Sequence, residues 1–69
     1  MKIILNGEEK LLNSTSGQMT IADLVLQLEL DVKKIAVEKD LEIVSLEQFS
    51  QVIIDEGSRI EIVHFIGGG

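Results

Sequence analysis

The sequence contains no cysteine, no tryptophan, no tyrosine and no proline, and its only aromatic residues are two phenylalanines. The lack of cysteine excludes a disulfide framework and any thiolate chemistry of the chain's own. A single histidine, His64, excludes a metal site built from histidines and cysteines. The scarcity of aromatic rings leaves few side chains on which bases or sugars could stack. Disulfides, thiolate chemistry and a histidine–cysteine metal site are therefore excluded.

Long apolar runs and excess basic charge are also lacking. The apolar runs are only a few residues long, too short to span a membrane, and Glu8 and Glu9 argue against a signal peptide. Twelve acidic residues against six basic ones give a net charge of −6, which repels nucleic acids and anionic membranes and favours partners with basic patches. On charge alone, the solubility of a small domain is the simpler explanation. We expect a cytoplasmic protein that binds neither nucleic acid nor membrane.

The chain is rich in aliphatic residues that can form a hydrophobic core. Apolar residues make up 45% of its 69 residues, enough for one core of isoleucine, leucine and valine. A chain this short buries only about 60% of the surface that its unfolded form exposes, which leaves room for a single domain. We expect one domain over residues 1–66, followed by a flexible glycine tail over residues 67–69.

The start of the chain predicts a β-hairpin. Asn6-Gly7 separates two apolar segments, and both central residues of a tight type I′ turn need positive φ, which asparagine and glycine tolerate. We therefore expect strands at about residues 2–6 and 8–13.

The segment "TIADLVLQLEL" predicts an amphipathic helix. The hydroxyl of Thr20 can cap its first turn, and Asp23 stands three residues on, as in a capping box. Apolar residues at helical spacing form one face: Ile21, Leu24, Val25 and Leu28.

The rest of the chain returns to strand patterns. We expect strands in residues 34–45 with a turn near 39–40, and a last strand at about 59–66 after a turn at 55–58. Residues 46–54 are ambiguous between a short helical turn and irregular packed chain. The order is typical of an α+β protein of the β-grasp (ubiquitin-like) type. We expect a mixed sheet of four to five strands, with first and last strands parallel at its centre and one helix on one face.

The alternation of side chains along the strands predicts which residues the helix leaves uncovered. The helix should cover Ile60 and Ile62 of the last strand together with Ile3 and Leu5 of the first. The opposite face then holds three apolar residues, which we expect to lie close together: Ile4, Val63 and Phe65. They could form a patch on which a partner docks. Alternatively, residues 46–54 could fold over them and make them minor core.

No motif assembles an active site within the chain. His64 has no serine or cysteine nucleophile in a recognisable arrangement, and residues 14–17 lack the lysine and the glycine spacing of a phosphate-binding loop. The acidic residues fall mostly in turns and on polar faces. We therefore expect no catalytic residue, no metal site and no bound cofactor.

The three final glycines are the remaining candidate site. Without a Cβ, Gly67 and Gly68 could thread a channel too narrow for other residues, and Gly69 would present a free α-carboxylate to another enzyme. Terminal glycines also occur as an incidental loose end, so composition alone leaves both interpretations open.

The two ends of the chain, "MKIILNGE" and "DEGSRIEIVHFIGGG", resemble the ThiS family, the sulfur carriers of thiamin biosynthesis. These are β-grasp domains of about this length that end in Gly-Gly. The likeness is weaker in the middle, through "TIADLVLQL" and "IAVEKDLEIVS". The chain departs from the family pattern at Asp40-Leu41, Ser45-Leu46, Phe49 and Gly57-Ser58. These departures bear on the choice of partner more than on the carrier role.

The resemblance implies that the chain is a protein co-substrate and not an enzyme. The Gly69 carboxylate would be adenylated by an E1-like (ThiF-type) enzyme, which holds the ATP and magnesium. Sulfur from a cysteine desulfurase would then give a C-terminal thiocarboxylate, which a ThiG-type thiazole synthase would receive. The alternatives are the sulfur-carrier subunit of molybdopterin synthase, a ubiquitin-like protein modifier, and an interaction module whose glycines are incidental.

Overall fold

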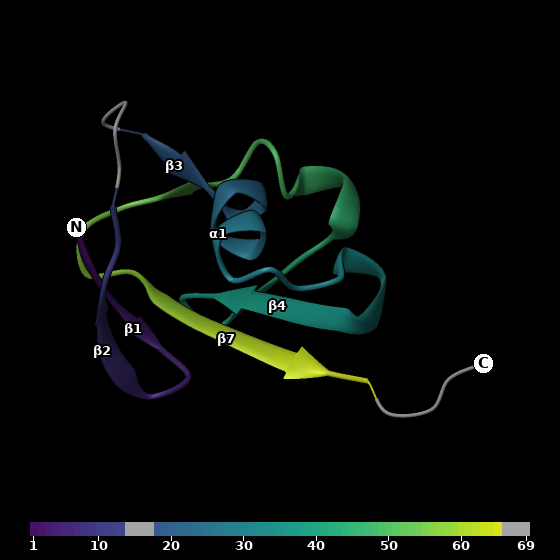
Figure 1. Ribbon diagram of the computed structural model, residues 1–69, viewed down its shortest axis with the longest axis horizontal. Helices are drawn as coiled ribbons and strands as arrows, with labels where there is room; N and C mark the ends of the chain where they lie inside the picture. The colour runs from purple at the N-terminus through teal and green to yellow at the C-terminus, as the bar shows by residue number, and fades with distance from the viewer. Residues whose placement is uncertain (14–17, 66–69) are drawn as a thin grey trace.

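The computed structural model describes residues 1–13 and 18–65, which form a five-stranded mixed sheet with one α-helix on one face (Figure 1). The strands of this sheet are ordered β2-β1-β7-β4-β5, and two short strands, β3 and β6, form a second sheet. The main strands are β1 (Lys2–Leu5), β2 (Glu8–Leu11), β4 (Ile35–Lys39), β5 (Glu42–Val44) and β7 (Arg59–His64). The other elements are β3 (Met19–Thr20), β6 (Ile53–Ile54), the helix α1 (Ile21–Gln27) and two 3₁₀ helices, η1 (Val32–Lys34) and η2 (Leu46–Gln48).

The expected hairpin joins β1 to β2. Asn6 and Gly7 have φ values of 50° and 84°, as a two-residue type I′ turn requires. The turn is also tied to β7, because the Asn6 N–H donates to the Ile60 carbonyl (2.9 Å) and the Asn6 Oδ1 accepts from the Ile62 N–H (2.7 Å). The second strand ends at Leu11, two residues earlier than predicted.

Strand β7 occupies the centre of the sheet, as expected. It pairs in parallel with β1, where Ile4 lies opposite Arg59. It also pairs antiparallel with β4, and this pairing covers every residue of β4. The first and last strands are therefore neighbours, although more than fifty residues separate them in the sequence. Every other strand of the main sheet is attached to β7 directly or through one hairpin.

Both ends of α1 are closed by hydrogen bonds. At the start, the predicted capping box is present: the Asp23 N–H donates to Thr20 Oγ1 (3.1 Å), and the Thr20 N–H donates to Asp23 Oδ2 (3.0 Å). At the end, Glu29 takes a left-handed φ of 57°, and the Leu30 N–H donates to the Val25 carbonyl (3.1 Å). This is a Schellman ending with glutamate where glycine is usual.

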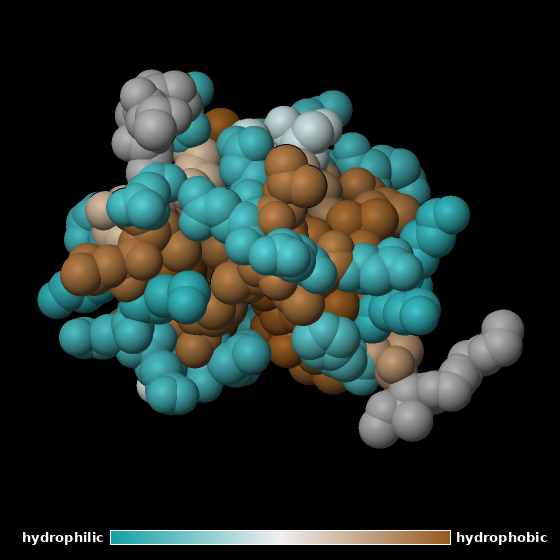
Figure 2. Space-filling model, in the orientation of Figure 1, coloured by the Kyte–Doolittle hydropathy of each residue, from teal (hydrophilic) through white to brown (hydrophobic). Residues whose placement is uncertain are grey.

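The core lies between the sheet and α1. The residues that are buried most completely come from both layers: Ile3, Ile21, Leu24, Val25, Val37 and Ile60. On the face drawn in Figure 2, apolar residues are visible across the middle of the view, with hydrophilic residues around and among them. The set predicted to face the helix is confirmed at Ile3, Ile60 and Ile62, whereas Leu5 is partly buried. Each fully buried aliphatic side chain contributes about 1.5 to 3 kcal/mol.

The ambiguous segment 46–54 packs on the helix side of the sheet (Figure 1). It begins with η2 and ends with β6, which pairs with β3. Phe49 is buried, and its carbonyl accepts from the Ala22 N–H (2.8 Å) in the first turn of α1. The segment therefore completes the core over the helix. The alternative in which it covers Ile4, Val63 and Phe65 is wrong.

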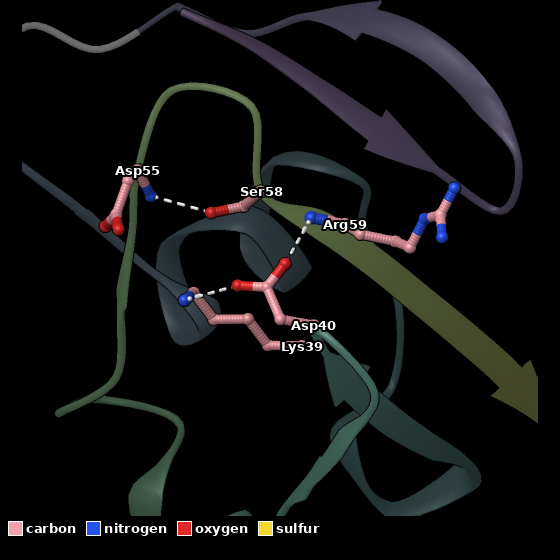
Figure 3. Close-up of polar contacts among 5 residues, drawn as sticks. All are labelled: Lys39, Asp40, Asp55, Ser58 and Arg59. Carbon is pink, nitrogen blue, oxygen red and sulfur yellow. Dashed lines mark hydrogen bonds and ion pairs between the residues drawn. The ribbon is translucent and has the colours of Figure 1, made fainter.

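The turn between β4 and β5 is held against the start of β7 (Figure 3). Asp40 and Leu41 both have left-handed φ values, 51° and 73°. The Asp40 N–H donates to the Arg59 carbonyl (2.7 Å), the Arg59 N–H donates to Asp40 Oδ1 (2.9 Å), and the Lys39 ammonium lies 3.0 Å from Asp40 Oδ2. The hydrogen bond from the Arg59 N–H, followed by that from Lys39, lowers the pKa of the Asp40 carboxyl.

The predicted turn at residues 55–58 is also confirmed. Gly57 has a φ of 83°, and the buried Ser58 hydroxyl oxygen accepts from the Asp55 N–H at 2.9 Å (Figure 3). The Gly57 N–H donates to the Lys2 carbonyl (2.8 Å). This turn therefore aligns the start of β7 with β1.

We predict that Leu41→Gly stabilises the domain. A leucine at positive φ costs roughly 1 to 2 kcal/mol, and glycine removes that cost while adding less than about 1 kcal/mol of lost chain entropy. Because the Leu41 side chain is 78% exposed, its removal forfeits little packing. Urea unfolding should show a rise of about 0.5 to 1 kcal/mol. Leu41→Ala, which keeps the Cβ, is the matched control. Equal stability of Leu41→Gly and Leu41→Ala would show that the positive φ at residue 41 does not strain the leucine.

We also predict that Asp40 stabilises the fold in a pH-dependent way. Its folded-state pKa lies below the ordinary 3.8, so its contribution is present above that pH and is lost as the pH falls through the folded pKa. The stability difference between the wild type and Asp40→Asn should thus be largest near neutral pH and shrink below about pH 4. Urea unfolding at several pH values measures it, with Asp55→Asn as control. A difference independent of pH would show that the charge has no role.

Candidate functional site

The face of the main sheet that α1 does not cover carries the residues predicted for partner docking; we call it the open face. Because Ile3, Val37, Ile60 and Ile62 are buried under the helix, strand alternation places their neighbours on the opposite side. The open face consists of Lys2 and Ile4 in β1, Glu9 and Leu11 in β2, Ala36 and Glu38 in β4, Ile43 in β5, and Arg59, Glu61 and Val63 in β7.

Two of the three residues predicted for a docking patch are well exposed. Val63 is 61% exposed and Phe65, just beyond the end of β7, is 59% exposed, whereas Ile4 is only partly exposed. The parity argument is confirmed for Val63, which lies on the open face beside Ala36 of β4. Two large apolar side chains are thus presented to solvent at the C-terminal end of β7.

The expectation that Ile4 joins these two residues is wrong. Ile4 lies opposite Arg59, and β1 ends at Leu5 opposite Ile60. Val63 is four residues further along β7, a displacement of about 13 Å at the rise of an extended strand. Parity predicts the face on which a residue lies, but the register decides its position along that face. Ile4 therefore belongs to the opposite end of the open face.

The end of β7 fixes the point at which the C-terminal segment leaves the domain. The Phe65 N–H donates to the Lys34 carbonyl (2.9 Å), which extends the β4–β7 hydrogen bonding to the last residue described. The predictions for Gly67, Gly68 and Gly69, and the predicted end of the domain at residue 66, concern residues outside the described ones. The structure thus shows where the segment begins but does not test its role.

Sequence reasoning missed the apolar and acidic residues next to Val63. Ile43 is 80% exposed and lies opposite Glu38, which in turn lies opposite Glu61 of β7. The signal was available in "AVEKDLEIV". If Asp40-Leu41 is taken as a two-residue turn, the pairing of Glu38 with Ile43 follows directly.

The described surface gives no support for catalysis within the chain. His64 ends β7 opposite Ile35 and is exposed. Within residues 1–13 and 18–65, no group of three or more histidine, aspartate or glutamate side chains is placed to hold a metal ion. No helix of this described part is both long and apolar enough to cross a membrane. The feature that remains is an apolar and acidic surface beside the point where the C-terminal segment begins.

Comparison with known proteins gives matches over the whole chain. A model of the ThiS family matches residues 3–69. A protein named sulfur carrier protein ThiS, from Bacillus subtilis (strain 168), is 38% identical over 65 residues, which cover 94% of this chain and 96% of that protein. Two proteins named thiazole synthase, from Paramagnetospirillum magneticum and Magnetococcus marinus, are 45% and 42% identical over all 69 residues. The chain spans about a fifth of the length of these two relatives, 20% of each.

Solved structures share the fold. The crystal structure of a thiamine biosynthesis protein (ThiS) from Geobacter metallireducens superposes with a TM-score of 0.84, at 23% identity and over the full length of both chains. A solution structure of a thiamine biosynthesis protein from the same organism gives a TM-score of 0.82 and is covered to 88%. These matches confirm the β-grasp fold. With a family model and a relative of similar length that both match almost end to end, the chain belongs to the ThiS family.

Proposed function

We propose that this chain is a sulfur carrier for the synthesis of the thiamin thiazole, with the sulfur held at Gly69. The observation that supports this most directly is the match to the Bacillus subtilis sulfur carrier, which covers 94% of this chain and 96% of that protein. The family model extends through the final glycines, to residue 69. In this proposal the chain is a co-substrate that other enzymes load and unload.

The chemistry needs an activated carboxylate. The Gly69 carboxylate oxygen attacks the α-phosphorus of ATP and releases pyrophosphate, which gives an acyl adenylate. The persulfide sulfur of the desulfurase then attacks the carbonyl carbon and AMP leaves, which gives an acyl disulfide. A thiol reductant cleaves the S–S bond of this disulfide and releases the thiocarboxylate. The ATP and magnesium belong to a ThiF-type adenylating enzyme, and a cysteine desulfurase supplies the sulfur. The soft thiocarboxylate sulfur can then attack an electrophilic carbon of the thiazole precursor.

A thiazole synthase is the proposed acceptor. Two relatives with 45% and 42% identity carry the matching domain within a protein named thiazole synthase. Joining the two activities in one polypeptide keeps the carrier at a high effective concentration near the synthase. A docking surface on the carrier would serve the same encounter, and the exposed Val63 and Phe65 can provide one.

The position of the docking surface limits where a partner's reaction centre can lie. Gly69 follows Phe65 by four residues, and a four-residue chain spans at most about 14 Å. Because the Phe65 backbone is bonded to Lys34, this distance is measured from a fixed point. A partner that binds Val63 and Phe65 can therefore receive the terminal carboxylate in a site close to its own docking surface.

We predict that the chain gains a thiocarboxylate and that deletion of Gly69 abolishes this gain. The protein is incubated with ATP, magnesium, cysteine, a thiol reductant, a ThiF-type enzyme and a desulfurase, and intact mass then shows whether sulfur has replaced one terminal oxygen. Since the buried core lies within Ile3–Ile62, the deletion should leave the thermal midpoint unchanged.

The Bacillus subtilis carrier, treated with the same enzymes, is the positive control for this experiment. An unmodified mass for this chain beside a modified control would reject the sulfur-carrier function. A lowered thermal midpoint on deletion of Gly69 would show instead that the terminal residue is part of the folded structure.

We further predict that Phe65→Ala weakens binding to the adenylating enzyme or to the thiazole synthase about tenfold, since large apolar side chains at the centre of an interface commonly cost more than 1 kcal/mol on truncation. The fold should survive because Phe65 is 59% exposed. Isothermal titration calorimetry measures the affinity. Leu26→Ala, which removes a 77% exposed leucine from the helix, is the matched control. Unchanged affinity for both partners would exclude Phe65 from docking.

A further inference from the structure

Two glutamates face each other across the middle of the open face. In the antiparallel β4–β7 pair, Glu38 lies directly opposite Glu61. The residues on either side, Val37 with Ile62 and Lys39 with Ile60, belong to the face that α1 covers. The two carboxylates therefore share the uncovered side. Like charges directly opposite in a sheet are destabilising, because their Cβ atoms are only about 5 Å apart.

No described residue forms an ion pair with Glu38 or Glu61. The two ion pairs formed among them are Lys2–Glu9 (3.8 Å) and Lys39–Asp40 (3.0 Å), and neither Glu38 nor Glu61 accepts a side-chain hydrogen bond within this part of the chain. Arg59 stands two residues before Glu61 on the same strand but forms no ion pair with it there. Residues 14–17 and 66–69 contain no lysine or arginine.

Apolar side chains flank the acidic pair on two sides. Ile43 continues the cross-strand row beyond Glu38 and is 80% exposed, while Val63 follows Glu61 on the same face of β7 and is 61% exposed. Ala36, opposite Val63, adds a small apolar surface. An acidic pair bordered by aliphatic groups is complementary to an arginine: the guanidinium can bond both carboxylates, and its methylene stem can pack on the aliphatic side chains.

We infer that the Glu38–Glu61 pair, with Ile43 and Val63 beside it, receives an arginine side chain of the thiazole synthase. The identity of this partner rests on the proposed function, since relatives carry the same domain inside proteins named thiazole synthase. The charge argues against a second copy of this chain as occupant. With a net charge of −6 on each chain, two copies that met through their Glu38–Glu61 pairs would repel each other.

The test measures the affinity for the thiazole synthase from the same genome by isothermal titration calorimetry. The variant Glu38→Gln/Glu61→Gln should bind about tenfold more weakly at low salt, because the arginine would lose both charged acceptors. Wild-type affinity should fall as salt rises from about 50 mM to about 500 mM, whereas the variant's affinity should change little. Its thermal midpoint should be equal to or above that of the wild type, which separates a binding defect from unfolding.

The control variant is Glu29→Gln/Glu47→Gln, which changes the net charge equally but lies off the open face. Wild-type affinity for this control supports the inference, whereas an equal loss in both double variants overturns it in favour of a general charge effect. The inference is also overturned if Glu38→Gln/Glu61→Gln binds the synthase normally. It is likewise overturned if sedimentation shows a wild-type dimer at low salt that the same substitutions dissociate.

The proposed function has its own readout. Thiocarboxylate formation on the wild-type chain is measured separately by intact mass, without the synthase. If the chain is loaded with sulfur but Glu38→Gln/Glu61→Gln does not change its affinity for the synthase, the proposed function stands and the arginine site is rejected. A chain that is never loaded rejects the proposed function, whatever the binding experiment shows.

Discussion

The structure depends on the packing of a single short helix against a five-stranded sheet. One helix can cover only one face of a sheet, so alternate residues in every central strand are assigned either to the core or to solvent. Ile60 and Ile62 lie under α1, and the residues between and after them, Glu61 and Val63, lie outside. The core and the candidate site are thus two sides of the same strand. Neither can be altered by a shift in register without exchanging the two sets.

The open face shows how a small domain manages an uncovered sheet. On this face, apolar residues such as Ile43 and Val63 alternate with charged residues, which divide the exposed apolar surface among the described residues into small areas. A surface of this mixed kind suits a partner that is bound and later released. An interface that was wholly apolar would hold the partner longer, because most differences in affinity between related complexes arise from dissociation.

Much of the fold could be predicted because local rules determine it. Asn6-Gly7 requires no tertiary information to form a tight turn, and the Thr20–Asp23 capping box marks the start of α1 within the sequence itself. The left-handed residues Glu29 and Leu41 could not be foreseen, since neither is a glycine. The turn at Leu41 is held by hydrogen bonds between Asp40 and Arg59, which lie far apart in the sequence. Residues 46–54 were ambiguous for the same reason: η2 and β6 owe their positions to contacts with α1 and β3.

In the candidate site too, features set by local sequence could be predicted, and features set by pairing between distant segments could not. Strand alternation was enough to predict that Val63 is exposed, because this prediction depends only on the burial of the neighbouring Ile62. The register between β1 and β7 was not available from the sequence, since the pairing joins distant segments, and Ile4 was therefore placed at the wrong end of the face. The Glu38–Glu61 pair was missed for the same reason. The glycines at residues 67–69 were found by composition and family resemblance, which carry no geometry.

The central position of β7 has a mechanical consequence. The backbone hydrogen bonds that join β7 to β1 and to β4 run across the strand, while the chain beyond Phe65 continues from its end. A pulling force on that end is therefore directed along β7 and loads the bonds on both flanks in shear, many at a time. A hairpin pulled open at its edge would instead lose its bonds one after another. The hydrogen bonds on both sides of β7 therefore resist a force on the C-terminal segment together.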